Sequence, residues 1–234
     1  KWHKYWKASQ SKSEAPDEVD WAQYGFSSLP PLDLPSPEDL RTSSKSFTKS
    51  TACGNDHLHP RHFALLSDKC LEGLIAILKW IGDTHVLPSK LLLLIVALLP
   101  KPTGGDRPIG IFPSVIRVWT KWLQPEYVAP WKNANRRDFF FGEEEKSCEA
   151  CVWIQATTAE YARAVSKDFA SALYDLEKAY ENVRHFLLAR EAHELGFPLR
   201  LLRLACLFYR MPRCIIVKGV ATAVVSTLHT IVPG

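Results

Sequence analysis

The sequence predicts an α+β fold, and three features lead to this prediction. Apolar residues recur at three- and four-residue spacing between residues 60 and 82, which is the period of an amphipathic helix. Two pairs of short apolar segments flank glycine-containing turns, at 103–106 and at 218–219, as in β-hairpins. With 47% hydrophobic residues among 234, the chain can also bury a core.

The first half of the chain is expected to hold a lead-in, a helix and a hairpin. Residues 1–50 are rich in Ser, Pro and charged residues, so we expect a mostly extended lead-in. A helix is expected to run to Gly82. Strands at 94–99 and 109–112 then form the first hairpin, because the glycines between them accept positive φ.

The second half is expected to alternate helices with strands. The elements, in order, are a helix at 115–123 that Pro125 and Pro130 end, a helix at 148–164, a strand up to Asp175, a helical stretch at 177–183, two helices separated by Gly196 and Pro198, and a hairpin at 215–225. Gly196 is suited to end a helix, and proline is favoured in a first helical turn.

Composition argues against a membrane protein. The longest apolar run, at 91–99, covers nine residues, whereas a membrane helix needs about 20. No apolar stretch follows the N-terminal lysines as it would in a signal peptide. We therefore expect an intracellular protein, nuclear or cytoplasmic, with no membrane partner.

Six cysteines are scattered along the chain, and only Cys148 and Cys151 have the spacing of metal ligands. A structural zinc site needs a second pair of Cys or His ligands, and none stands at suitable spacing. We therefore expect reduced thiols.

Positive charge is concentrated between residues 184 and 218. This segment has seven Lys and Arg against two Asp and Glu, a net charge of +5, while the whole chain carries +4. Such a segment can bind phosphates in a salt-dependent manner, although an ordinary solvated helix face explains it equally well. The candidate nucleic-acid-binding residues are Arg200, Arg203, Arg210 and Arg213.

Asp175 is the strongest candidate for a metal ligand. Leu173 and Tyr174 favour a strand and residues 177–183 favour a helix, so Asp175 is expected at the C-terminal tip of a strand, where sites gather in α/β proteins. The alternative is that Asp175 is an N-cap or turn residue.

Five segments of the chain stand in an order that resembles a known family. They are 51–60 with Gly54, Asp56 and His57; 98–109 with Lys101 and Arg107-Pro108-Ile109; 140–150 with Phe140-Phe141-Gly142 and Ser147-Cys148-Glu149-Ala150; 175–185 with Asp175, Ala179, Tyr180, Glu181, Val183 and His185; and 195–234 with Leu195-Gly196-Phe197-Pro198, Arg213, Gly219 and Val232-Pro233-Gly234. In this order they resemble the reverse transcriptases, especially those of non-LTR retrotransposons. The first segment departs from the family pattern Gly-x-Asp-Gly at its last position, where this chain has His57.

The resemblance implies a partial right-hand polymerase within the α+β class. After the lead-in at 1–50 it implies fingers at 51–150 and the first part of an incomplete palm at 151–234. Nucleotides are added in this family by phosphoryl transfer with two Mg²⁺ ions. Asp175 would be the catalytic residue and a metal ligand, and the carbonyl oxygen of Leu176 a further ligand. Glu177 is expected to be a solvated acid at a helix start.

Three other side chains are implied to bind the nucleotide. Lys101 and Arg107 would contact the triphosphate, and the ring of Tyr180 would exclude a ribose hydroxyl and so favour deoxynucleotides. By themselves, the first two could be ordinary surface cations near a turn, and Tyr180 an aromatic packed into the palm. The implied partners are an RNA template, a DNA primer and deoxynucleoside triphosphates.

The family's remaining metal ligands lie in a Tyr-x-Asp-Asp hairpin, and no Asp-Asp pair occurs in this sequence. We therefore expect a truncated fragment of an RNA-directed DNA polymerase from a mobile element, inactive by itself. The alternatives are a non-catalytic nucleic-acid-binding module and an inert retroelement relic.

Overall fold

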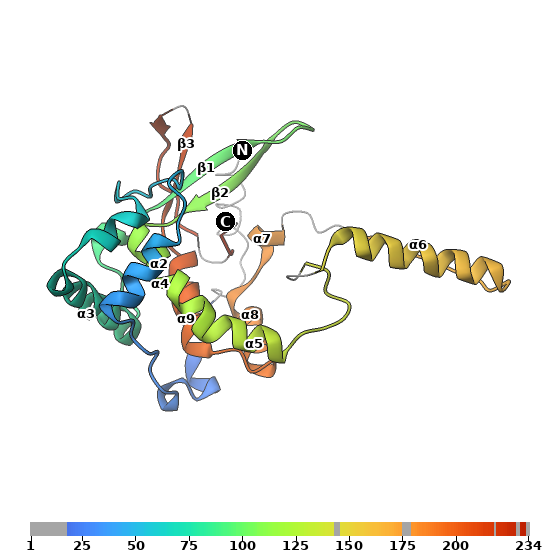
Figure 1. The fold of residues 1–234 in the computed structure, drawn as a ribbon, viewed down its shortest axis with the longest axis horizontal. Helices are drawn as coiled ribbons and strands as arrows, with labels where there is room; N and C mark the ends of the chain where they lie inside the picture. Colours follow the sequence, from blue (N-terminus) through green and yellow to red (C-terminus); the bar gives the residue numbers. More distant parts are fainter. Residues whose placement is uncertain (1–17, 143–145, 175–178, 218, 228–229, 233–234) are drawn as a thin grey trace. The chain divides into compact units, whose positions relative to one another are not determined.

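The computed structural model describes residues 18–142, 146–174, 179–217, 219–227 and 230–232. The chain forms two compact units, one made of Lys1–Pro130 with Lys178–Gly234 and the other of Trp131–Glu177. Helices and a small sheet are both present (Figure 1), so the predicted α+β class is confirmed. The boundary that we expected at residue 150 coincides with neither boundary of these units.

The first unit contains a four-stranded sheet with the order β2-β1-β3-β4. Its strands are β1 (Leu94–Pro100), β2 (Asp106–Ile111), β3 (Arg213–Val217) and β4 (Val220–Ala221). Both predicted hairpins are confirmed, since β1 pairs with β2 and β3 with β4 in antiparallel fashion. β1 and β3 are parallel neighbours, so one sheet joins strands of the expected fingers and the expected palm.

The main core of this unit is built largely from three helices, α3 (Asp68–Thr84), α4 (Ser114–Leu123) and α9 (Leu199–Tyr209). α3 confirms the helical period that the sequence shows up to Gly82. Trp119 of α4 is fully buried, and its ring contacts Phe208 of α9 with 6.3 Å between centroids. These helices support the end of the sheet at which β1 begins, because Leu94 belongs to the same core.

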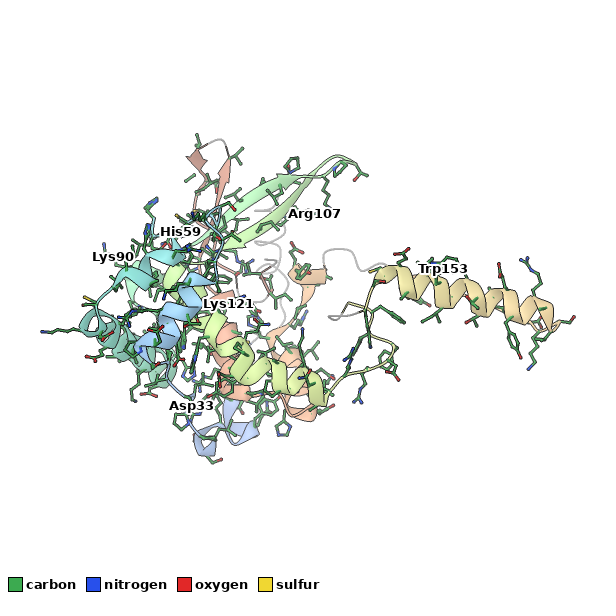
Figure 2. The ribbon with its side chains drawn as sticks, in the orientation of Figure 1. Asp33, His59, Lys90, Arg107, Lys121 and Trp153 are labelled. Carbon is green, nitrogen blue, oxygen red and sulfur yellow. The ribbon has the colours of Figure 1, made fainter. Side chains whose placement is uncertain are left out.

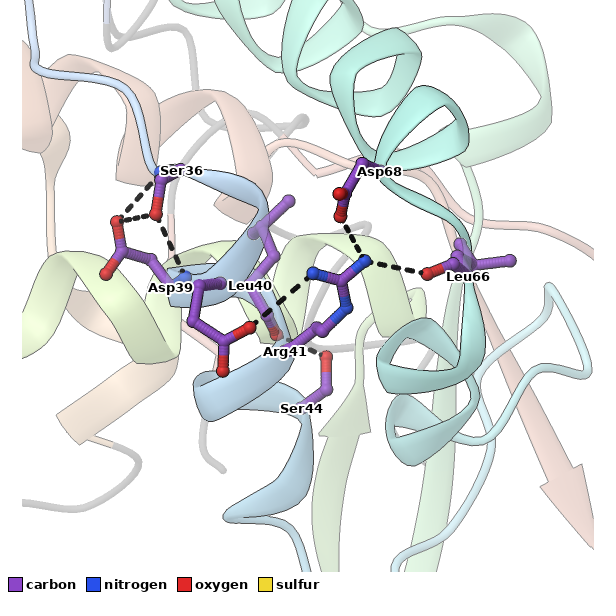
Figure 3. Close-up of polar contacts among 8 residues, drawn as sticks. Ser36, Asp39, Leu40, Arg41, Ser44, Leu66 and Asp68 are labelled. Carbon is purple, nitrogen blue, oxygen red and sulfur yellow. Dashed lines mark hydrogen bonds and ion pairs between the residues drawn. The ribbon is translucent and has the colours of Figure 1, made fainter.

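The expectation of an extended lead-in is wrong for residues 37–45, which form helix α2 (Pro37–Lys45). Ser36 caps this helix: its hydroxyl accepts a hydrogen bond from the Asp39 N–H at 3.2 Å, and the Asp39 carboxylate accepts one from the Ser36 N–H at 2.8 Å (Figure 3). Proline is tolerated at position 37 because the N–H groups of a first helical turn have no acceptor within the helix, so the N–H that proline lacks is not needed there. Leu40 is then fully buried in the core.

Arg41 ties α2 to the start of α3 (Figure 3). Its guanidinium donates to the Leu66 carbonyl at 3.1 Å and forms an ion pair with Asp68. Because the Asp68 side chain is largely exposed, solvent screens this ion pair and its contribution to stability is small.

Pro125 and Pro130 do not end the helical chain after Leu123, contrary to expectation. α4 continues into a π-helical segment, η5 (Gln124–Val128), and then into α5 (Ala129–Ala134). Pro125 and Pro130 are the second residues of η5 and α5, so both prolines lie where the helical geometry changes between α and π.

Shorter helices complete the first unit. They are η1 (Trp21–Tyr24), η2 (Phe26–Ser28), η3 (Pro60–Leu65), η4 (Ser89–Leu91), α7 (Ala179–Asn182) and α8 (His185–Glu194). Gly196 follows α8 with φ of 64°, a left-handed conformation that suits the predicted end of this helix.

The second unit contains α6 (Cys148–Ala164), whose bounds agree with the prediction. The Ser147 hydroxyl caps it by accepting a hydrogen bond from the Ala150 N–H at 3.1 Å. Trp153 projects from this helix (Figure 2), and the residue is 68% exposed. Cys148 and Cys151 are both exposed free thiols.

The strand that we expected before Asp175 is absent from the described residues up to Tyr174. Leu173 and Tyr174 are 87% and 91% exposed and belong to no strand. Bulky β-formers favour a strand only where a neighbouring strand packs against them. The described part of the second unit contains no strand that could do so.

Among all the residues that the structure describes, no helix is both long and apolar enough to cross a membrane.

Candidate nucleotide-binding site

Lys101 and Arg107 lie near the tip of the β1–β2 hairpin, and both are exposed. The Lys101 N–H donates to the Gly105 carbonyl at 2.9 Å, which closes the turn, while Gly104 and Gly105 take left-handed φ of 87° and 83°. Arg107 lies on β2 (Figure 2). It stands directly opposite Leu99 of β1. Lys101 directly follows β1, at the start of the turn that joins the two strands.

The base of this hairpin is held by Asp56, which comes from the Gly54-Asn55-Asp56-His57 segment. The Asp56 carboxylate accepts a hydrogen bond from the Ser114 N–H at 2.6 Å, at the first residue of α4. The Ser114 hydroxyl donates to the Leu58 carbonyl, and Ser114 is fully buried. A negative charge at a helix N-terminus is stabilising. Asp56 therefore links its segment to the chain that leaves β2.

The backbone explains both ends of the Gly-x-Asp-Gly pattern. A Cβ on Gly54 would lie 2.5 Å from the Phe112 carbonyl oxygen, so no larger residue fits there without a backbone shift. His57 has φ of 54°, in the left-handed region that favours glycine. The position at which the sequence departs from the family pattern therefore keeps the backbone conformation for which glycine is suited.

Arg117 adds a second link between this segment and α4. Its guanidinium donates to the Ala52 carbonyl at 2.6 Å and lies 5.4 Å from the centroid of the Phe47 ring. Burial lowers the pKa of Arg117, and the nearby charge of Asp56 acts in the opposite direction. Sequence reasoning missed Ser114 and Arg117, because their partners lie more than 50 residues away along the chain.

Tyr180 lies in α7, and the residue is 51% exposed. Its carbonyl accepts a hydrogen bond from the Ile231 N–H at 3.0 Å, so α7 contacts the C-terminal segment of the first unit. The next residue, Glu181, lines a small cavity together with Pro108 of β2. Pro108 and Arg107 point to opposite faces of the hairpin. α7 thus contacts the Pro108 face, and the structure does not bring Tyr180 against Lys101 and Arg107.

Arg213, expected to bind nucleic acid, is only 2% exposed, and its side chain makes hydrogen bonds in the interior. Its guanidinium donates to the Tyr209 carbonyl at 2.8 Å and to the Thr230 hydroxyl at 2.7 Å. The Thr230 carbonyl also lies 2.8 Å from the His185 Nε2. Burial lowers the pKa of Arg213 to about 10, with Glu181 acting in the opposite direction. Its guanidinium therefore does not reach the surface where a phosphate would bind.

The other three arginines expected to bind nucleic acid are part-buried. Arg200 donates twice to the Leu29 carbonyl, at 3.0 and 2.6 Å, and covers the Phe26 ring at 4.9 Å. Arg203 covers the same ring at 4.4 Å, and Arg210 lines a cavity beside α9. Arg200 therefore mainly secures the N-terminal segment, whereas Arg203 and Arg210 border open space.

The expected metal ligands, Asp175 and Leu176, lie outside the residues that the structure describes, as does Glu177. Within the described ranges, no three or more His, Cys, Asp or Glu side chains gather as a metal site would require.

No protein-family model matches this chain, and no curated protein matches it either.

Proposed function

We propose that this chain is part of an RNA-directed DNA polymerase of the reverse transcriptase class, and that it supplies the fingers hairpin and the first part of the palm. Its partners would be an RNA template, a DNA primer and deoxynucleoside triphosphates. Mg²⁺ would be the cofactor, held by the carboxylate of Asp175 and the carbonyl oxygen of Leu176, because hard cations prefer oxygen ligands.

The observation that carries the proposal is the backbone of residues 54–57. Gly54 has no space for a side chain, His57 takes a glycine-like conformation, and Asp56 between them caps α4. Glycine is suited to the first and last of these positions, and a hydrogen-bond acceptor is suited to the third. These features support the resemblance of the segment to the Gly-x-Asp-Gly pattern.

The first unit also brings together residues from three of the five resembling segments, since Pro108, Glu181 and Val232 line one small cavity. Asp56 contacts the residue that follows the hairpin, and Gly110 of β2 packs against Val232 so closely that a Cβ would lie 2.0 Å from the valine methyl. The Ile231 N–H binds the Tyr180 carbonyl. These contacts join segments that are far apart in the sequence, as one polymerase site would require.

In this proposal Lys101 and Arg107 contact the triphosphate, and both are exposed near the tip of the hairpin. Binding of dTTP to the chain tests this role without needing catalysis. We expect the double variant Lys101→Gln/Arg107→Gln to weaken binding at least tenfold, since each charge-assisted hydrogen bond contributes roughly 1.5–3 kcal/mol. Lys90→Gln is the matched control, because Lys90 is an exposed cation that precedes β1 (Figure 2). Equal binding by both variants would refute the assignment.

Catalysis is tested by primer extension on an RNA template with Mg²⁺. The 234-residue chain is expected to give none, because it contains no Asp-Asp pair. In a polypeptide that also includes a Tyr-x-Asp-Asp hairpin, Asp175→Asn should abolish extension and Glu177→Gln should retain most of it. Equal loss in both variants would show that the metal ligand is misplaced. Template binding without extension in the longer polypeptide would favour a non-catalytic nucleic-acid-binding module.

A further inference from the structure

A basic cavity of about 200 Å³ lies between α9 and the N-terminal segment of the first unit. Its wall includes Val19, Trp21, His85, Arg203 and Arg210, and no residue of the β1–β2 hairpin. Arg203 and Trp21 also border a wider hollow of about 590 Å³. One water occupies roughly 30 Å³ of liquid, so the cavity has room for a group of several heavy atoms.

Arg203 brings a positive charge into this space, and no acidic side chain among the described residues pairs with it. Its guanidinium lies 4.4 Å from the Phe26 ring centroid and 5.8 Å from that of Trp21. In the part of the chain that the structure describes, no hydrogen bond or ion pair involves this guanidinium. Burial and the neighbouring Arg200 both lower the pKa of Arg203. A part-buried cation among neutral rings and a second cation is costly, and a bound anion would offset that cost.

His85 also lines this cavity. It caps the C-terminus of α3 in a left-handed conformation, with φ of 56°, and its ring contacts Phe26 at 5.4 Å between centroids. Burial, Arg203 and Arg200 together lower the pKa of His85 to about 4, although Asp83 opposes this shift. His85 is therefore neutral near pH 7 and leaves the arginines as the charges of the site.

We propose that this cavity binds a phosphate group, carried by a nucleotide or by a nucleic-acid strand, with Arg203 as its principal ligand. The planar guanidinium of Arg203 matches two phosphate oxygens, and Arg210 adds a second positive charge to the wall. Among the described residues that line the cavity, Glu18 is the one carboxylate, and it is exposed. This site is separate from the triphosphate contacts of Lys101 and Arg107, and it does not depend on polymerase activity.

Calorimetric titration of the whole chain with inorganic phosphate tests the proposal. Arg203→Gln is expected to weaken binding about tenfold or more, which is the loss typical of a charge-assisted hydrogen bond. Arg190→Gln should leave binding unchanged, because Arg190 is exposed on α8 and paired with Glu191. Equal affinity of these two variants for phosphate would overturn the proposal.

Glu18→Gln keeps the test decisive even if Arg203→Gln unfolds, because Glu18 is exposed and its replacement leaves the rings in place. Removing the one carboxylate should tighten phosphate binding by roughly twofold to fivefold, the range of an exposed charge interaction. Phosphate binding should also raise the pKa of His85, which NMR titration measures directly. No change of affinity in Glu18→Gln, or an unchanged pKa of His85 at saturating phosphate, would refute the site.

Two further titrations distinguish the source of the phosphate. Tighter binding of AMP than of a short single-stranded DNA identifies a nucleotide, and the reverse order identifies a strand. Acetate serves as the control anion, and acetate binding as tight as phosphate binding would refute the assignment to phosphate.

Discussion

Gly110→Ala is expected to destabilise the first unit, because the new methyl group would overlap Val232. The added Cβ would lie 2.0 Å from the Val232 Cγ1 and 3.4 Å from a methyl carbon of Leu94, whereas carbon atoms in contact normally lie about 3.5–4.0 Å apart. One side of this overlap must therefore move by more than an ångström. Overpacking of this kind typically costs about 1–3 kcal/mol.

Val232→Ala provides the test of the mechanism. Alone it should cost about 1 kcal/mol, since it removes apolar atoms that are only partly buried. Combined with Gly110→Ala it should relieve the overlap. The double variant should therefore lose less free energy of unfolding than the sum of the losses of the two single variants. The expected coupling is about 1–2 kcal/mol, within the range observed for residues in contact.

Urea denaturation followed by circular dichroism measures these free energies of unfolding. Gly73→Ala is the control, because nothing lies within 4 Å of the Cβ that it adds in α3. It should stabilise the chain by about 0.5–1 kcal/mol, the difference in helix propensity between Ala and Gly. A neutral Gly110→Ala, or strictly additive effects in the double variant, would refute the packing of Val232 on β2.

Three further predictions concern single residues. Asp56→Ala should lower the free energy of unfolding by about 1–2 kcal/mol, because α4 loses a charged cap on Ser114; an effect below about 0.3 kcal/mol in urea denaturation would contradict this role. His57→Gly should be tolerated whereas His57→Val should cost about 1–2 kcal/mol in the same assay, because a β-branched residue resists the left-handed backbone; equal stability of the two variants would argue against the glycine-like conformation. The pKa of His85 is lowered to about 4 in the folded chain. As the pH falls, His85 is therefore protonated in the unfolded chain before it is protonated in the folded chain, so the free energy of unfolding should decrease between about pH 6.5 and pH 4. His85→Asn, which tolerates the left-handed backbone, should lose less stability over this window, and an identical pH dependence of the urea midpoints would count against burial of a neutral His85.

The local sequence pattern was sufficient to predict most helices and strands of the fold. The bounds of α6, the two hairpins and the end of α8 at Gly196 follow from hydrophobic period and from glycine at turns, which act over a few residues. The same reasoning failed at Pro37 and Pro125. Proline fits the first turn of a new helix, as at Pro37, and it is tolerated where a continuous helix changes to π-helical geometry, as at Pro125. The presence of a proline in the sequence does not by itself distinguish these cases from the end of a helix.

By itself the sequence determined the α+β class, the two hairpins and the candidate residues, because period, turn chemistry and residue type are local properties. Only the tertiary structure decided which candidate side chains are free of internal packing roles and lie where a ligand could reach them. It buried Arg213 against Thr230, placed Arg200 on the Leu29 carbonyl, left Arg203 beside a cavity and set Asp56 against Ser114. These outcomes depend on contacts between residues that are 17 to 171 positions apart, and such contacts form only when packing brings distant segments together.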